Sequence, residues 1–583
     1  MSWHAVATSD GLTWQAGAEA LGADGAWSVC GRLRLVQGER VIPAAQQLAT
    51  VLRALEQHGA DAAQHLEGAF AFIARNQATG ETLLMRDRFG IQPLWYSRRA
   101  DGALVAASSA AGVFAQLPQR PPVDERMIGM LLVHSIPDAW HTPWRGVYRL
   151  PPAHVARDAG EGVRLTRYWS VGTAEPVRGQ SARDLCAGIR ERFITATRRC
   201  VDDWDSSAAF LSGGIDSSAV VSTLATLGPA GASMPTFSMT YGDDPEANED
   251  FFREAVTAQV GWPSTTMNVA DADPLALDAE VRRRIGSAVW GPVTYQRMCL
   301  LPKLAERGVR SVFDGYEGDV VASYGIARMN EFVRSGQVVR ALMECHRASG
   351  RLDYRRTVQL IRNWMLRPFA PSWLHGLWDR WRGNKRGLFA YTVISEAAEQ
   401  RLGIRDWLHD IYSAELPRWE SRRDHWLGIT SPGLVYTLET WQALNHSFGI
   451  DGRFPFFDRE LVEYCFALPA ALKFNHGWTR IGFRQAMRGI LPDAVRARGG
   501  KASLVDPYET VMGRVGPPAL RRFLADPGPL AEYVDLAAVQ RVHDLLVQGK
   551  ADFMDANNAW VVVHLDGFLR GEGLAPERSL LHD

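Results

Sequence analysis

A loop rich in glycine and serine, set between an apolar run and a helix-like run, restricts the fold of this chain more than any other feature. Residues 208–224 read AAFLSGGIDSSAVVSTL. The apolar lead-in from Ala208 to Leu211 predicts a short buried strand, and the run from Ala219 to Leu227 has helical propensity and spacing. A strand, a flexible loop and a helix start create an anion-binding geometry, because glycines let the backbone approach a ligand and the first helical N–H groups are available.

The neighbouring stretches continue this alternation of strands and helices. Residues 186–201 predict a helix, residues 235–241 a strand, residues 249–261 a second helix, and residues 309–321 a strand that ends in a glycine-rich turn. Strands that alternate with helices predict a parallel, doubly wound α/β sheet, whose ligands gather at the carboxyl ends of the strands. From about residue 325 to the end the pattern is mostly helical.

The first third of the chain has a different organisation. Short β-like runs and one helix near Gln46 to His58 predict an α+β sandwich of antiparallel sheets. The polar stretch GTAEPVRGQSARD, residues 172–184, predicts a domain boundary. We therefore expect one domain over residues 1–172 and a second over residues 185–583, with an insertion near residues 325–430.

Charge and cysteine content narrow the class of protein. The 583 residues contain 64 Lys and Arg against 65 Asp and Glu, a net charge of −1, so no global field favours nucleic acid or an anionic membrane. The six cysteines form no CxxC pair, which suits reduced thiols. The N-terminus lacks a secretory pattern, and no apolar run approaches the length of a membrane span. We expect a cytoplasmic protein without nucleic-acid partners or membrane insertion.

Several motifs, taken in order, resemble the asparagine synthetase superfamily. FLSGGIDSS (210–218), TFSMTY (236–241), FDGYEGD (313–319), GRFPFFDRELVEYCFALP (452–469) and TRIGFRQAMRGILPDAVRARGGK (479–501) follow one another as in that superfamily. HLEGAFAFIARN (65–76) and MRDRFGIQPLWYS (85–97) resemble its glutamine amidotransferase domain. The resemblance covers nearly the whole chain except the insertion.

The departures from the superfamily pattern are informative. A working glutaminase domain of this kind carries a cysteine directly after Met1, whereas this chain has Ser2, and Cys30 is far from the terminus in sequence. CGRLRL, residues 30–35, places Arg32 where the resemblance leads us to expect a carboxylate. A hydroxyl is a much weaker nucleophile than a thiolate. We therefore expect the N-terminal domain to be an inactive remnant, and the amine to come from another substrate.

Superfamily members without the cysteine resemble intramolecular amide formers, namely the β-lactam and carbapenam synthetases and the cyclases of lasso peptides. The resemblance implies ATP and Mg²⁺ as cofactors, and adenylation of a carboxylate with release of pyrophosphate. It also explains why the loop lacks the Gly-Lys-Ser/Thr ending of the common phosphate loop. Nucleotide-binding residues carried over from the motifs are Leu211, Ser212, Gly213, Gly214, Asp216, Ser217, Ser218, Ser238, Met239, Gly315 and Arg484.

The resemblance also assigns chemical roles to single residues. Asp216 and Asp319 are the expected Mg²⁺ ligands, because carboxylates suit this hard cation. Tyr316 matches a β-lactam synthetase tyrosine that works with a glutamate to deprotonate the attacking amine; Glu344 is the candidate partner by spacing, and Glu317 an alternative. Lys501 matches a lysine that stabilises the departing pyrophosphate and the tetrahedral oxyanion. Each of these residues also has an ordinary structural interpretation as a turn former, packing aromatic or solvated cation.

Residues 354–387 favour the peptide cyclase among these alternatives. This stretch mixes arginines with Trp364, Trp373, Trp378 and Trp381, and aromatic and cationic side chains together can anchor a peptide. A pair of amphipathic helices packed on the core is the structural alternative. We expect macrolactam formation on a precursor peptide, with a leader-binding protein and a leader peptidase as partners. A β-lactam or carbapenam-type synthetase and a degenerate, non-enzymatic peptide scaffold remain the alternatives.

Overall fold

The computed structural model describes residues 3–8, 11–15, 20–24, 26–160, 162–242, 248–292, 294–349, 354–366, 369, 389, 391–415, 420–500 and 505–571. Its N-terminal part contains two antiparallel sheets with strand orders β10-β8-β9-β1-β2 and β12-β11-β7-β6-β4-β3, and β5 pairs with β4. These strands are β1 (His4–Thr8), β2 (Gly11–Gln15), β3 (Ala20–Asp24), β4 (Trp27–Gln37), β5 (Arg40–Val41), β6 (Gly68–Asn76), β7 (Thr82–Arg86), β8 (Trp95–Arg98), β9 (Leu104–Ala107), β10 (Val147–Arg149), β11 (His154–Asp158) and β12 (Val163–Arg167).

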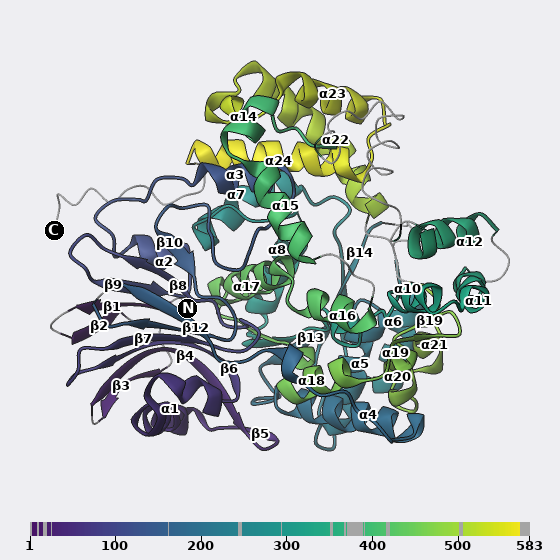
Figure 1. Ribbon diagram of the computed structural model, residues 1–583, viewed down its shortest axis with the longest axis horizontal. Coiled ribbons are helices and arrows are strands. Elements are labelled where there is room, and N and C mark those ends of the chain that lie inside the picture. Colours follow the sequence, from purple (N-terminus) through teal and green to yellow (C-terminus); the bar gives the residue numbers. More distant parts are fainter. Residues whose placement is uncertain are drawn as a thin grey trace.

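The sequence of β6 shows why the two sheets stack. Ala71 and Ile73 face the core between the sheets, whereas Phe70 and Phe72 face a second core that the helix α1 (Ala44–His58) covers. Alternate residues of a strand point to opposite faces, so a run without polar residues is buried on both sides. Figure 1 shows α1 beneath this sheet. The predicted helix near Gln46 to His58 and the antiparallel sheets are confirmed.

A third sheet carries the rest of the molecule, and all its strands are parallel. Its order is β15-β14-β13-β16-β17. The chain therefore adds β14 and β15 on one side of β13, and β16 and β17 on the other side. Ligands in such sheets bind where the strand order reverses. The predicted parallel sheet is confirmed. Its strands are β13 (Ser207–Phe210), β14 (Thr236–Thr240), β15 (Ser264–Asn268), β16 (Ser311–Phe313) and β17 (Asp451–Arg453).

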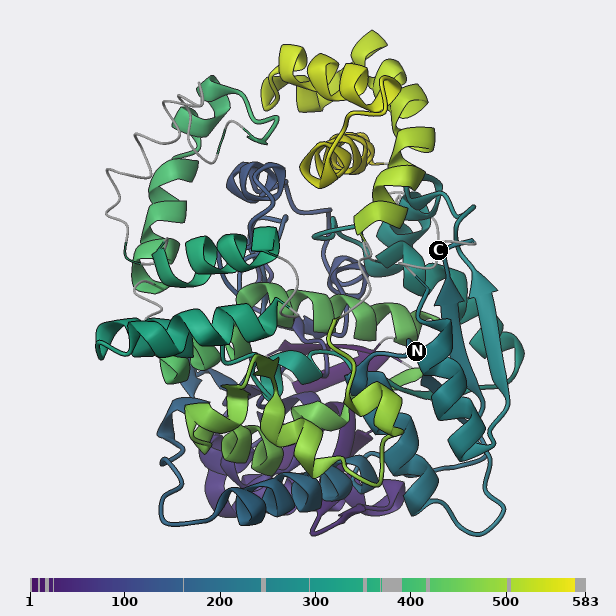
Figure 2. The same ribbon diagram turned by 90° about the vertical axis from the view of Figure 1, so that its right-hand side faces the viewer.

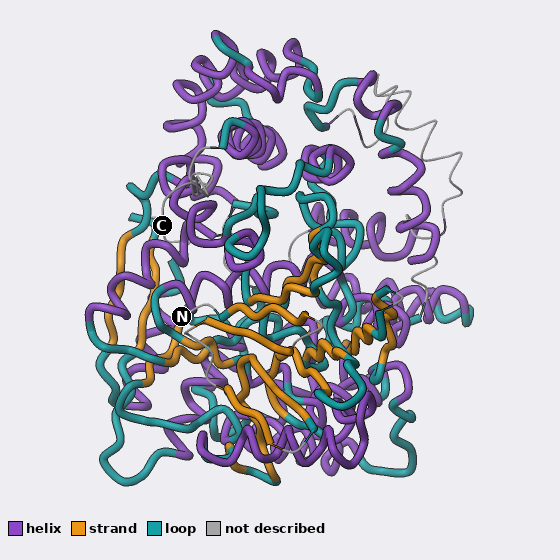
Figure 3. The backbone as a smooth tube through the Cα atoms, turned by 90° about the vertical axis from the view of Figure 1, so that its left-hand side faces the viewer, coloured by secondary structure: helices purple, strands orange, loops and turns teal. Residues whose placement is uncertain are grey.

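Helices connect and cover this sheet, and Figure 3 shows the strands gathered in one half of the molecule with helices around and above them. The helices up to residue 334 are α2 (Ala110–Phe114), α3 (Glu125–Leu132), α4 (Ala182–Arg198), α5 (Ile215–Leu227), α6 (Asp250–Val260), α7 (Pro274–Ile285), α8 (Thr294–Glu306), α9 (Gly318–Val321) and α10 (Arg328–Arg334). Those from residue 338 to 447 are α11 (Val338–Ala348), α12 (Tyr354–Leu360), η3 (Ile361–Leu366), α14 (Glu396–Arg401), α15 (Ile404–Glu415), α16 (Ser421–Ile429) and α17 (Pro432–Ser447).

The C-terminal part is helical, as predicted, and its last three helices lie together in the upper part of the view in Figure 2. Its elements are η6 (Pro455–Phe457), α18 (Arg459–Ala467), α19 (Ala470–Lys473), β18 (Phe474–Asn475), β19 (Trp478–Thr479), α20 (Ile481–Ala486), α21 (Asp493–Arg496), α22 (Val505–Ala525), η7 (Gly528–Glu532), α23 (Leu536–Val547) and α24 (Phe553–Leu569). Within the residues described, no helix is both long and apolar enough to cross a membrane.

One hydrophobic core joins the N-terminal part to the parallel-sheet part. It contains Val105 of β9 and Ile128 of α3 together with Leu301 of α8 and Phe568 of α24, all of them buried. Trp144 packs edge-on against Phe568, with 5.0 Å between the ring centres. The predicted boundary near residues 172–184 therefore separates two stretches of chain that share one core.

Candidate active site

A cavity of about 500 Å³ opens at the carboxyl edge of the parallel sheet. It lies at the ends of β13, β14 and β16, where the strand order reverses. The segments that line it are spread between residues 210 and 500, and the fold brings them together. The lining includes ten of the residues that the motifs predicted: Leu211, Ser212, Gly214, Asp216, Ser217, Ser238, Met239, Gly315, Tyr316 and Asp319.

Hydrogen bonds to hydroxyl groups within the loop after β13 fix the conformation of this loop. The backbone N–H of Gly214 donates to Ser212 Oγ at 3.1 Å, and the N–H of Ser212 donates to Ser217 Oγ at 3.2 Å. No side chain caps α5, which begins after Gly214. The positive end of an uncapped helix therefore faces the cavity, as phosphate binding requires.

Gly315 fits the turn after β16 against this loop. A Cβ at this position would lie 2.4 Å from the backbone nitrogen of Ser217 and 2.6 Å from the carbonyl carbon of Asp216, closer than any real contact. Only glycine allows the two strand ends to approach this closely. The approach brings Tyr316 and Asp319 beside the start of α5.

The two carboxylates assigned to the metal both line the cavity. Arg480 Nη1 donates to the two carboxylate oxygens of Asp216 at 2.7 and 2.8 Å, and the hydroxyl of Tyr324 donates to Asp319. Among the described residues no three metal-ligating side chains form a group. Two carboxylates fit Mg²⁺, which commonly binds through one or two of them and completes its shell with phosphate oxygens and water.

Two arginines that the motif comparison missed also line the cavity. Arg498 donates to the carbonyl oxygen of Gly213 at 2.7 Å and pairs with Glu249, and Arg480 is buried against Asp216. Arg480 and Glu317, which also lines the cavity, both have left-handed backbones with φ of 55°. Such strain in residues other than glycine costs about 1–3 kcal/mol and gathers at functional sites. The RxxxR spacing of Arg480 and Arg484 was the available sequence signal.

Four of the predicted residues need correction or lie elsewhere. Arg484 is turned away from the cavity, where it donates to the backbone oxygens of Arg496 at 2.7 Å and Arg498 at 2.9 Å, so it holds the loop that presents Arg498. Gly213 and Ser218 do not line the cavity, and Ser218 is fully buried. Lys501 lies outside the described residues.

We also correct the prediction that Glu344 assists Tyr316. Glu344 is 1% exposed on α11, and its carboxylate accepts a hydrogen bond from the N–H of Gly477 at 2.6 Å and pairs with Arg347 at 2.9 Å. It does not line the cavity. Sequence spacing misled the prediction, because α11 belongs to the inserted helical segment, which packs against the β18–β19 hairpin.

Glu317, its neighbour in the chain, and Thr437 are instead the side chains that act most directly on the hydroxyl of Tyr316. Burial, followed by the negative charge of Glu317, raises the pKa of Tyr316 well above 10. The phenol ring packs against Trp441 with 4.5 Å between ring centres, and its hydroxyl lies 3.5 Å from the carbonyl oxygen of Leu434. Tyr316 is therefore a neutral phenol at pH 7, and a proton can pass through it only if it releases its own.

The wall formed by β14 is organised by side chains from outside the strand. Ser238 Oγ donates to the carbonyl oxygen of Leu211, and Arg253 donates to the carbonyl oxygen of Met239 at 3.2 Å. Gln296 of α8 donates to the hydroxyl of Tyr241 at 2.7 Å. These contacts fix the backbone of the strand end that carries Ser238 and Met239, two of the expected nucleotide-binding residues.

Cys30 of the N-terminal part is closed off from solvent. This thiol is fully buried between the two sheets, and burial raises its pKa to about 12. Arg32, two residues along the same strand, is 8% exposed. Ser2 lies outside the described residues.

Two family models match this chain. The model of asparagine synthase matches residues 188–570, and that of the glutamine amidotransferase domain matches residues 36–169. Asparagine synthetase (glutamine-hydrolyzing) 3 of Bacillus subtilis is 23% identical over 75% of this chain and 67% of its own length. Amidase chyE of Penicillium rubens is 22% identical over 76% of this chain and 69% of its own.

A third relative shares a shorter and more similar stretch. Carboxyethyl-arginine beta-lactam-synthase of Streptomyces clavuligerus is 32% identical over 35% of this chain and 36% of its own length. The asparagine synthase match spans well over half of the 583 residues and includes every segment that lines the cavity. The chain therefore belongs to the asparagine synthase family of ATP-dependent carbon–nitrogen ligases.

Proposed function

We propose that this ligase closes a macrolactam ring on a peptide. A side-chain carboxylate oxygen of Asp or Glu attacks the α-phosphorus of ATP, and the bond to pyrophosphate breaks. The N-terminal amine of the same peptide then attacks the acyl carbon, so that AMP leaves and an amide forms. The observation that carries the proposal is the cavity, which brings an anion-binding loop and two carboxylates together with the partly buried Tyr316 and Glu317.

Hydrogen-bond donors and positive charge identify the end of the cavity that would bind phosphate. The start of α5, the hydroxyl groups of Ser212 and Ser217, and the guanidinium groups of Arg480 and Arg498 would bind phosphate oxygens and stabilise the departing pyrophosphate. Mg²⁺ held by Asp216 and Asp319 would neutralise the phosphate charge. Arg480 pairs with Asp216, and it would move to phosphate when the carboxylate binds a cation.

At the other end, Tyr316 and Glu317 would handle the proton of the amine. An α-amino group with a pKa of about 7.7–8.0 must lose protons to form an amide. Because Tyr316 is a neutral phenol, it would accept the amine proton while passing its own to Glu317. Glu317 has a left-handed backbone, and the charge of its carboxylate acts on the phenol.

Two features support a peptide substrate over free ammonia. The thiol of Cys30 is buried and neutral, so the N-terminal part offers no described nucleophile for glutamine. In addition, exposed apolar side chains gather on α11, at Val338, Val339, Leu342 and Met343, and such patches are typical of interaction surfaces. A precursor peptide, its leader-binding protein and its leader peptidase are the partners that we propose.

β-Lactam formation on a small amino acid is the second candidate. The 32% identity to Carboxyethyl-arginine beta-lactam-synthase favours it. Both candidates use the same cavity, and they differ only in the length of chain between the carboxylate and the amine.

The test uses the purified full chain with ATP, Mg²⁺ and synthetic precursor peptides encoded beside its gene. We expect AMP, pyrophosphate and a peptide lighter by one water. Tyr316→Phe should keep adenylation, measured as hydroxamate formed with added hydroxylamine, but slow ring closure about 10²- to 10⁴-fold. Asp216→Ala should abolish both reactions, and Tyr391→Phe, at a half-exposed tyrosine outside the cavity, should change neither.

Three results would contradict the proposal in different ways. If the chain binds nucleotide but forms no AMP with any precursor peptide, it acts as a binding scaffold and not as an enzyme. Turnover of a small β-amino acid without turnover of peptides would establish the second candidate. Ring closure by Tyr316→Phe at the wild-type rate would remove Tyr316 from the chemistry.

A further inference from the structure

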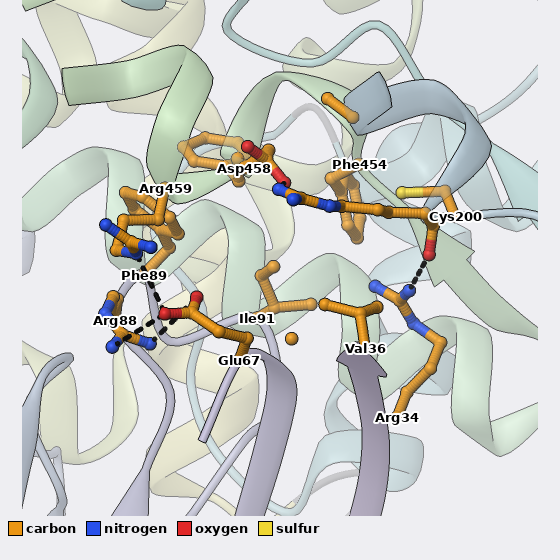
Figure 4. Close-up of a pocket in the computed structure, with 14 residues that line it drawn as sticks. Arg34, Val36, Glu67, Arg88, Phe89, Ile91, Cys200, Phe454, Asp458 and Arg459 are labelled. Carbon is orange, nitrogen blue, oxygen red and sulfur yellow. Dashed lines mark hydrogen bonds and ion pairs between the residues drawn. The ribbon is translucent and has the colours of Figure 1, made fainter. Parts of the chain in front are cut away.

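A second, smaller cavity lies where the N-terminal part meets the ligase part (Figure 4). Its volume is about 40 Å³, enough for about three waters or one small anion. It is lined by the ends of β4 and β6, the end of α4 and the segment from Phe454 to Arg459, and it does not share a polar residue with the active site.

The lining residues include four arginines and two acids: Arg34, Arg88, Arg199, Arg459, Glu67 and Asp458. Three of the arginines have carboxylate partners. Arg199 pairs with Asp458 at 2.9 Å and with Glu460 at 3.0 Å. Arg88 and Arg459 share Glu67, at 3.2 and 2.9 Å, and Arg459 also reaches Glu463 at 3.2 Å.

Arg34 is the exception. Arg34 is 7% exposed, and its Nη1 donates a hydrogen bond to the carbonyl oxygen of Arg199 at 3.0 Å. No carboxylate in the described part of the chain pairs with it, and its Nε–H has no hydrogen-bond partner. Arg88, 8% exposed, also has an unpartnered Nε–H. Figure 4 shows the guanidinium group of Arg34 at the edge of the cavity, opposite Arg88 and Arg459.

A buried guanidinium without a counter-charge costs several kcal/mol, and proteins compensate such charges with a partner or an ion. We propose that this cavity binds one small inorganic anion, chloride or phosphate, which neutralises Arg34. The anion would stabilise the contact between the two parts of the molecule. Phe457 lines the same cavity and packs 6.2 Å, between ring centres, from Tyr316, so the bound anion would also stabilise the wall behind the active site.

The test measures thermal unfolding of the full chain at constant ionic strength. Potassium gluconate, whose anion is too large for the cavity, is replaced stepwise by potassium chloride or by potassium phosphate. We expect a saturable rise in melting temperature, which follows ln(1 + [anion]/Kd). The two titrations identify which anion binds more tightly. Crystals grown with bromide should show an anomalous peak within hydrogen-bonding distance of Arg34.

Arg34→Gln removes the charge but keeps a donor for the carbonyl oxygen of Arg199. It should abolish the anion response, and in gluconate it should melt no lower than the wild type. Arg40→Gln, at an exposed arginine on β5, should keep the full response. A wild-type melting temperature that is equal in gluconate, chloride and phosphate would overturn the proposal, as would a full response from Arg34→Gln.

Discussion

The buried ion pair between Arg86 and Glu439 should hold the two parts of the molecule together more strongly than any exposed contact. Arg86 ends β7, is fully buried, and donates to Glu439 Oε2 of α17 at 2.9 Å. The same guanidinium donates to the carbonyl oxygens of Gln92 at 2.8 Å, Leu150 at 2.6 Å and Gly90 at 2.8 Å. Glu439 is 3% exposed.

The contacts allow the cost of two substitutions to be compared. Glu439→Gln keeps an oxygen acceptor but leaves the buried guanidinium without its counter-charge, and breaking such a pair costs about 3–5 kcal/mol. Arg86→Met leaves a buried carboxylate and also removes the donor from three carbonyl oxygens, each of which costs about 1–3 kcal/mol. Arg86→Met should therefore destabilise the protein by at least about 3 kcal/mol more than Glu439→Gln.

Urea unfolding, followed by hydrogen exchange in β7 and α17, would measure both effects. Glu56→Gln, at an exposed glutamate on α1, is the matched control and should change the unfolding free energy by less than about 0.5 kcal/mol. The reasoning fails if Glu439→Gln is as stable as the control, or if Arg86→Met costs no more than Glu439→Gln.

Three further predictions concern the active site, the buried amine and the N-terminal thiol. Gly315→Ala should lose ATP binding in calorimetry, because its Cβ would press on the backbone of Ser217 at 2.4 Å, whereas Gly513→Ala, with nothing within 4 Å, should bind normally. Burial lowers the pKa of Lys473 from 10.5 to about 8. Between these pH values the unfolded chain keeps a proton that the folded chain has lost. The unfolding free energy of the wild type therefore rises by up to about 3 kcal/mol as pH increases through this window. Lys473→Met lacks this gain, so the stability of the variant relative to wild type should fall across that window; a constant difference would contradict the assignment. Glutamine should yield no glutamate, and the native protein should resist thiol-directed electrophiles at Cys30, whose pKa burial raises to about 12.

The sequence was sufficient to predict those parts of the site that depend on local chain chemistry. The strand, loop and helix around Ser212 and the turn around Gly315 each follow from apolar runs and glycines within a few residues. Their convergence followed from the rule that carboxyl ends of parallel strands meet at one edge.

The missed residues depend on packing between distant segments. Arg480 reaches Asp216 from 264 residues away, through a hairpin and a short helix whose position no local pattern encodes. The same cause explains the error for Glu344, since a count of residues cannot show which way a helix in an insertion faces. The carboxylate whose charge acts on Tyr316 is instead that of Glu317, the next residue in the chain, and its left-handed backbone was not apparent from the sequence.

The core shared by β9, α3, α8 and α24 limits which parts of the chain can be removed, in evolution or by engineering. Removing residues 1–172 would expose the apolar faces of α7, α8 and α24 to water. The N-terminal segment thus supplies part of a hydrophobic core that the rest of the chain cannot complete alone. A variant truncated to isolate the ligase part should aggregate. Its lack of activity would then say nothing about the catalytic residues.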